Sequence, residues 1–129
     1  MKKLVLLTIM MFFGIFAYAQ TATTHQWVTT THDFGKIEHN KPATCEFKIT
    51  NKGTTALVVA TVSPSCGCTT PEYTKDPIAP GKSGFVKATY SAATVGPFSK
   101  TITITLSNGS TEVLTIKGEV NAAKTAGNQ

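Results

Sequence analysis

The sequence predicts an all-β sandwich, and three observations lead to that fold class. Short segments alternate apolar and polar residues, turn residues separate them about every 8–12 positions, and no segment after residue 20 has helical periodicity. We expect six to eight short strands. Because the helices needed to connect parallel strands are missing, antiparallel Greek-key connections fit better than βαβ units.

The first nineteen residues have the pattern of a secretory signal peptide. Lys2 and Lys3 precede an apolar run over residues 4–16, and the run ends in Ala17-Tyr18-Ala19. A membrane-spanning helix needs roughly 20 apolar residues, which this run lacks. We therefore predict cleavage between Ala19 and Gln20, export to the periplasm or the extracellular space, and no membrane span in the mature chain.

The mature chain has the length of one domain. We expect a flexible N-terminus over 20–26, a β-sandwich over 27–120 and a disordered tail over 121–129. Residues 71–84 contain three prolines and two glycines and are expected to form one long connection. The predicted strands cover 27–32, a short piece around Ile37, 43–50, 56–62, 85–90 and a final hairpin that begins near 102.

The segment 43–50 alternates cleanly and places Cys45 on its apolar face, together with Phe47 and Ile49. Free cysteine on such a face is usually a small buried hydrophobic residue. The turn Asn51-Lys52-Gly53 predicts a hairpin in which Cys45 lies opposite Thr61. The second strand of that hairpin, 56–62, is apolar on both faces and is expected to be central.

The last hairpin has a turn at Asn108-Gly109. A two-residue turn would place Leu114 on the outer face, whereas a three-residue loop from Asn108 to Ser110 sets Ile104 opposite Leu114 and Ile102 opposite Ile116. Since a slip of one residue turns every side chain to the other face, burial favours the odd-length loop.

The triplet Cys66-Gly67-Cys68 is the one stretch with reactive side chains at a specific spacing. Three interpretations remain open. Cys66 and Cys68 could form a disulfide that is easily reduced, they could bind a soft metal such as Cu(I) or zinc as two ligands, or one of them could bridge to Cys45. Three cysteines cannot all pair within one chain.

Other functional patterns are weak. The net charge is +5, and removal of Lys2 and Lys3 would leave +3. The chain has no arginine, the residue favoured for phosphate and base contacts, and we expect no nucleic-acid partner. The histidines His25, His32 and His39 are spaced by seven residues. In an extended chain they alternate between the two faces, so we expect them to be polar surface residues.

No nucleophile elbow of a hydrolase occurs, and we expect neither an enzyme nor a cofactor.

Several motifs occur in a fixed order and together resemble a known family. They are Asp33-Phe34-Gly35-Lys36-Ile37, Phe47-Lys48-Ile49-Thr50-Asn51-Lys52-Gly53, Ser65-Cys66-Gly67-Cys68-Thr69, Ile78-Ala79-Pro80-Gly81-Lys82-Ser83-Gly84, Gly96-Pro97-Phe98 and Ile116-Lys117-Gly118. The chain resembles the bacterial domain of unknown function 1573, in the wider immunoglobulin-like group of the major sperm protein and Hydin-type domains.

The resemblance covers roughly residues 27 to 120 and implies an exported immunoglobulin-like sandwich of seven to eight strands. It also implies that Cys66 and Cys68 are the pair and that Cys45 is core filler. It brings no known activity, because a fold alone does not give function. We therefore expect a non-catalytic binding or scaffold module of the cell envelope whose partner is another envelope or secreted protein. The alternative is thiol redox or soft-metal binding at Cys66 and Cys68.

Overall fold

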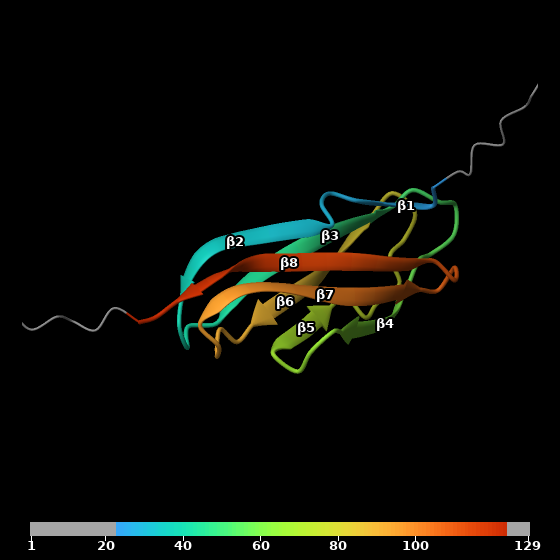
Figure 1. Cartoon of the computed structure of the whole chain (residues 1–129). Coiled ribbons are helices and arrows are strands. Elements are labelled where there is room, and N and C mark those ends of the chain that lie inside the picture. The colour runs from blue at the N-terminus through green and yellow to red at the C-terminus, as the bar shows by residue number, and fades with distance from the viewer. Residues whose placement is uncertain (1–22, 124–129) are drawn as a thin grey trace, which may run out of the picture.

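The computed structural model describes residues 23–123 as two packed β-sheets of four strands each (Figure 1). The predicted signal peptide and most of the predicted tail lie outside the described residues. No helix in the described range is long and apolar enough to cross a membrane. The strands are β1 (His25–Trp27), β2 (Thr31–Glu38), β3 (Ala43–Asn51), β4 (Val59–Pro64), β5 (Thr69–Tyr73), β6 (Ser83–Tyr90), β7 (Gly96–Leu106) and β8 (Thr111–Asn121).

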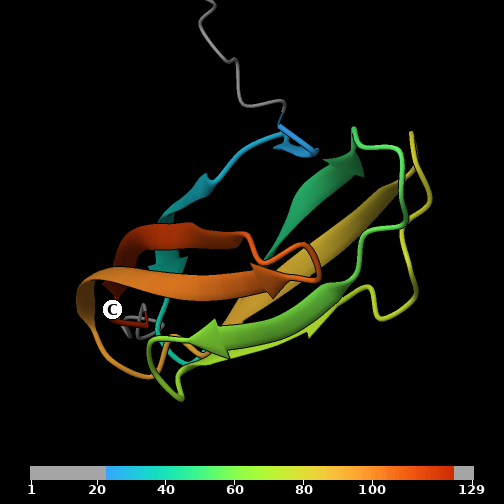
Figure 2. The ribbon, with the colours of Figure 1, turned by 90° about the vertical axis from the view of Figure 1, so that its right-hand side faces the viewer.

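One sheet has the order β1-β3-β6-β5 and the other the order β2-β8-β7-β4 (Figure 2). The chain changes sheet three times, between β1 and β2, between β2 and β3, and between β3 and β4, before it crosses again at the Cys66 loop. All pairs are antiparallel except β2 with β8, which is parallel. The predicted all-β immunoglobulin-like sandwich is thus confirmed with eight strands, and the parallel pair is a feature that the sequence did not indicate.

The core lies between the two sheets and consists of the inward-facing residues of the long strands. In β3 the alternation seen in the sequence matches the burial, with Cys45, Phe47 and Ile49 inside. The fully buried large side chains are Phe47, Ile49, Val86, Ile102, Ile104, Leu106, Leu114, Ile116, Val120 and Asn51. Each such aliphatic or aromatic side chain contributes about 1.5–3 kcal/mol relative to an exposed one.

The hairpin expected after β3 does not form. β3 pairs with β6, so Cys45 lies opposite Ala88 rather than Thr61. Residues 52–58 carry the chain to the other sheet, where β4 is an edge strand that pairs only with β7. The segment carries apolar residues on both faces because a bulge between Val59 and Thr61 changes which face is buried. Leu57 and Val59 are buried before the bulge, and Val62 packs against the core after it. Leu57 also forms an isolated bridge to Ile78.

Two boundaries also differ from the prediction. The segment expected to be one long connection, 71–84, begins within β5, which pairs with β6 from Thr69 to Tyr73. The sandwich begins at His25, where β1 pairs with the end of β3, although residues 20–26 were expected to be flexible.

The β7–β8 hairpin has the odd-length loop that burial required, but the loop lies one residue earlier. The Leu106 amide donates to the Ser110 carbonyl at 2.9 Å, so the loop is Ser107 to Gly109, with Gly109 at φ +85°. Leu114 is buried as predicted and Val113 is 51% exposed. The register is shifted by two residues, since Ile102 lies opposite Leu114 and Ile104 lies opposite Glu112.

Candidate functional site

The Cys66 loop, residues 65–68, connects two edge strands that belong to different sheets. β4 ends at Pro64 in one sheet, and β5 begins at Thr69 in the other. Cys66 and Cys68 form a disulfide, with their Cα atoms 5.3 Å apart. This separation is within the usual range for disulfides. Both cysteines are partly exposed, and the glycine between them is exposed.

Hydrogen bonds hold the Cys66 loop on both sides. The Ser65 amide donates to the Thr101 carbonyl at 2.8 Å, and the Thr101 amide donates to Ser65 Oγ at 3.1 Å. On the other side the Ser91 amide donates to the Cys68 carbonyl at 2.9 Å. The loop is therefore positioned by β7 and by the end of β6, independently of the disulfide.

Cys68 also lines a small pocket of about 260 Å³, formed with the residues that connect β6 to β7 and with the start of β7. Its lining contains one charged side chain, Lys100, and no acidic residue. Along the chain the lysine nearest to the triplet is Lys75, and Lys100 is far from it. Strand pairing between β4 and β7 brings Lys100 to the loop, and no local pattern could have revealed it.

Cys45 lies on β3 and is not part of the Cys66 loop. Its side chain is 7% exposed within the core, and it is the free cysteine of the described range. Burial raises the pKa of the Cys45 thiol to about 11, against a smaller opposing effect of a hydrogen bond with the Ala88 backbone. The prediction that Cys45 is a small buried hydrophobic residue is confirmed.

A metal at Cys66 and Cys68 would need both sulfurs as thiolates, and the structure joins them. Among residues 23–123, no group of three or more His, Cys, Asp or Glu side chains could hold a metal ion. A closed zinc site usually has four protein ligands. The soft-metal hypothesis stays a prediction for the reduced protein, in which two ligands would come from this loop.

A second candidate site is the outer edge of β3. The Lys52 amide donates to the Thr24 carbonyl and the Val28 amide donates to the Lys48 carbonyl, so the even-numbered residues of β3 turn their backbone groups away from β6. β1 covers this edge only as far as Lys48. Within the described range, the amides and carbonyls of Thr44 and Glu46 have no backbone partner.

The edges of β4 and β5 are protected by proline. The Cys68 carbonyl and the Thr74 amide face β6, so Pro71 occupies a position whose backbone nitrogen faces outward. Pro64 has the same place in β4, because the neighbouring Ser65 amide faces β7. Proline at such positions prevents strand addition. The uncovered part of β3 carries no proline and no bulge, which distinguishes it from these two edges.

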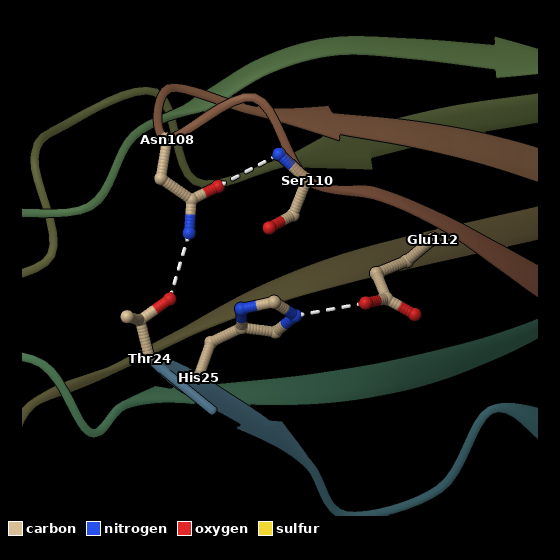
Figure 3. A network of polar contacts seen from close by, with 5 residues as sticks. All are labelled: Thr24, His25, Asn108, Ser110 and Glu112. Atoms are coloured by element: carbon tan, nitrogen blue, oxygen red, sulfur yellow. Dashed lines mark hydrogen bonds and ion pairs between the residues drawn. The ribbon is translucent and has the colours of Figure 1, made fainter. Parts of the chain in front are cut away.

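A polar network that the sequence did not predict joins β1 to the β7–β8 hairpin (Figure 3). His25, expected on the surface, is 7% exposed, and its Nε2 lies 3.0 Å from Glu112 Oε1. Asn108 Nδ2 donates to Thr24 Oγ1 at 2.7 Å. The N-terminal strand is thereby linked to the opposite sheet at one end of the sandwich.

Most of the sequence motifs serve packing or chain geometry. Asn51 is buried, with Nδ2 donating to the carbonyls of Thr55 and Ile78 at 2.7 and 2.8 Å and Oδ1 accepting from the Gly53 amide at 2.9 Å. It therefore joins the Asn51-Lys52-Gly53 motif to the segment that begins at Ile78. The backbone groups it satisfies would otherwise be buried without partners.

The Asp33-Phe34-Gly35, Gly96-Pro97-Phe98 and Ile116-Lys117-Gly118 motifs meet at one place. β2 has a bulge between Asp33 and Lys36, and it brings Gly35 over β8. A Cβ atom at Gly118 would lie 2.8 Å from the Gly35 carbonyl oxygen and 3.0 Å from the Phe98 ring. The Phe98 ring in turn stacks on Tyr90 with centroids 3.9 Å apart. Glycine is required at 118 by this close approach.

Comparisons with known proteins agree with this architecture. A Porphyromonas gingivalis W83 protein of unknown function aligns with a TM-score of 0.65 at 19% identity, over 78% of this chain and 50% of that one. The PapD-like domain 7 of human CEP192 aligns with a TM-score of 0.64 at 12% identity, over 79% of this chain and 88% of that one. The Vibrio cholerae VesB protease aligns with a TM-score of 0.55 at 15% identity, over 77% of this chain and 32% of that one.

At these identities the similarity shows the fold alone. The chain spans half the length of the P. gingivalis protein. No curated protein matches the sequence. The profile of the family described as protein of unknown function DUF1573 matches residues 25–120, which include all six motifs, and the chain belongs to that family.

Proposed function

We propose that this protein is an exported, non-catalytic binding module of the bacterial cell envelope, and that it holds its partner by adding a strand to the outer edge of β3. The observation that carries the proposal is the unpaired stretch of Thr44 and Glu46, in contrast to the edges of β4 and β5, which are protected by proline. Partner strands commonly add to exposed sheet edges, where main-chain hydrogen bonds provide the affinity.

The chemistry of this edge favours a partner strand with polar residues. Thr44 and Glu46 are exposed on the outer face of the sheet, where Glu46 lies 3.8 Å from Lys87 across the β3–β6 pair. The inward-facing neighbours Cys45 and Phe47 are already covered by the opposite sheet. The partner would gain backbone hydrogen bonds at the edge and contacts with one mixed-charge face.

Site-specific crosslinking in the producing bacterium tests the edge. A photoreactive residue at position 44 is expected to give one adduct of defined mass with an envelope or secreted protein, whereas the same residue at Glu72 on β5 gives none. Glu46→Pro should abolish the adduct, because it removes an outward-facing amide while keeping every hydrogen bond to β6. Glu46→Gln keeps that amide and should retain the adduct.

Equal adducts at positions 44 and 72, or an adduct that survives Glu46→Pro, would refute edge binding. Export is tested separately by fractionation and intact mass. We expect a periplasmic or extracellular protein that begins at Gln20. Recovery of the chain in the cytoplasm with Met1 retained would refute the envelope assignment.

A further inference from the structure

The Cys66–Cys68 disulfide contributes little to holding its own loop. It closes a loop of only three residues, and the constraint that a disulfide places on the unfolded chain decreases with loop size. Backbone hydrogen bonds from Ser65 to Thr101 and from Ser91 to Cys68 already fix both sides of the loop. The position of the disulfide at an exposed connection therefore needs another explanation.

The two sulfurs have different surroundings. Cys68 packs against the hydrophobic core and lines the pocket that contains Lys100. Cys66 is partly exposed and belongs neither to that packing nor to that pocket. Cys66 is therefore open to an incoming reagent outside the core packing, while Cys68 and Lys100 line the same pocket.

We propose that the Cys66–Cys68 disulfide is a thiol–disulfide exchange site that accepts two electrons from a dithiol, with Cys66 as the attacked sulfur and Cys68 as the leaving thiolate. This role goes beyond the binding function and does not depend on it. Partly exposed disulfides are in general the ones that exchange, whereas structural disulfides resist reduction.

The exchange has two steps. One thiolate of the dithiol attacks Cys66 Sγ, a mixed disulfide forms, and the bond to Cys68 breaks, which leaves Cys68 as a thiolate in the pocket that Lys100 also lines. The second thiolate of the dithiol then attacks the other sulfur of the dithiol, which is bonded to Cys66 in the mixed disulfide. This step closes the dithiol into a disulfide and releases Cys66. The dithiol becomes a disulfide, the protein gains two thiols, and the two protons pass from the dithiol to Cys66 and Cys68.

Lys100 would act by stabilising the leaving thiolate. A positive charge near a thiol favours its thiolate, and a more stable thiolate leaves faster. The free cysteine does not interfere, because Cys45 is buried in the core on a different strand. The site is therefore a pair with one attacked sulfur, one leaving sulfur and one positioning residue.

The first experiment measures reduction of the mature protein by dithiothreitol in native buffer, with acid quenching, alkylation and mass spectrometry. A Cys45→Ala background leaves two thiols to count. We expect complete reduction while circular dichroism stays that of the folded protein. Lys100→Gln should slow the reaction about threefold at low salt, and the difference should shrink at high salt, whereas Lys75→Gln should match the parent.

The second experiment identifies the attacked sulfur. A brief exposure to reduced glutathione is followed by alkylation, and fragmentation spectra locate both groups. We expect glutathione on Cys66 and the alkyl group on Cys68. The proposal is overturned if glutathione is found mainly on Cys68, if Lys100→Gln and Lys75→Gln react alike, or if reduction occurs only at the rate of global unfolding.

Discussion

His25 Nε2 lies 3.0 Å from Glu112 Oε1, and this contact joins the first strand of one sheet to the last strand of the other (Figure 3). Glu112 lies opposite the buried Ile104, so its side chain points toward the interior at the end of the core. His25 reaches it from β1, which has only three residues paired with β3. The pair closes this end of the sandwich.

Removal of the carboxylate should destabilise the protein. In Glu112→Ala, the buried His25 ring loses its hydrogen-bond partner at Nε2, and we expect the free energy of unfolding to fall by about 1–3 kcal/mol. Glu119→Ala, an exposed change on the same strand, should stay within about 0.5 kcal/mol of the parent. Urea unfolding measures both variants, and equal effects would contradict the structural role of the pair.

The Cys45 thiol should make the free energy of unfolding depend on pH in the alkaline range. Burial raises its pKa from 9.0 to about 11, so the folded state holds the thiol proton more tightly than the unfolded state does. The contribution is fully present below pH 9 and is lost as the pH rises from 9 to about 11. The free energy of unfolding should therefore decrease more steeply over this range in the parent than in Cys45→Ala. Parallel curves would show that the thiol does not contribute.

Loss of the disulfide should cost little stability. The chain-entropy relation gives about 1.6 kcal/mol for a three-residue loop, compared with about 3 kcal/mol for a loop of fifteen residues. We expect Cys66→Ser with Cys68→Ser to lower the free energy of unfolding by about 1–2 kcal/mol and to leave the fold intact. A loss above about 4 kcal/mol, seen by guanidinium unfolding, would mean that the bridge is a structural staple after all.

Substitution by alanine should affect stability differently at two glycines from the sequence motifs, Gly118 and Gly67. Gly118→Ala places a Cβ against the Gly35 carbonyl and the Phe98 ring, and overpacking of this kind costs about 1–3 kcal/mol. Gly67→Ala meets nothing within 4 Å and has no positive φ, so it should be neutral or stabilise by up to about 1 kcal/mol. Thermal unfolding distinguishes the two variants, and similar losses at both positions would contradict the close approach at Gly118.

Local sequence patterns correctly predicted which residues are buried in strands that have one buried face and one exposed face. The alternation from Ala43 to Thr50 correctly placed Cys45 inside, and the burial of Leu114 correctly required an odd loop in the last hairpin. The register of the β7–β8 hairpin was predicted wrongly, because Glu112 faces inward where it meets His25. These two residues are 87 positions apart in the sequence, so no local pattern indicates their contact.

The candidate sites were predicted less completely. The Cys66–Cys68 pair followed from its spacing and from the family resemblance, but Lys100 reaches it only through the pairing of β4 with β7. β5 was missed because its Pro71 is typical of a loop, although an edge strand tolerates proline at an outward-facing position. The open edge of β3 depends on where β1 ends, and no residue pattern in β3 itself indicates this.

The parallel pair of β2 and β8 has a mechanical consequence. The described chain enters at the end of the sandwich that holds Thr24 and leaves at the opposite end near Asn121 (Figure 1). Tension applied between these two points loads the β2–β8 pair, which runs from Thr31 opposite Thr115 to Glu38 opposite Asn121 and is interrupted by one bulge. Such a load shears these hydrogen bonds together instead of opening them one at a time. The parallel pairing of β2 with β8 thus sets these hydrogen bonds across the line between the two ends of the described chain.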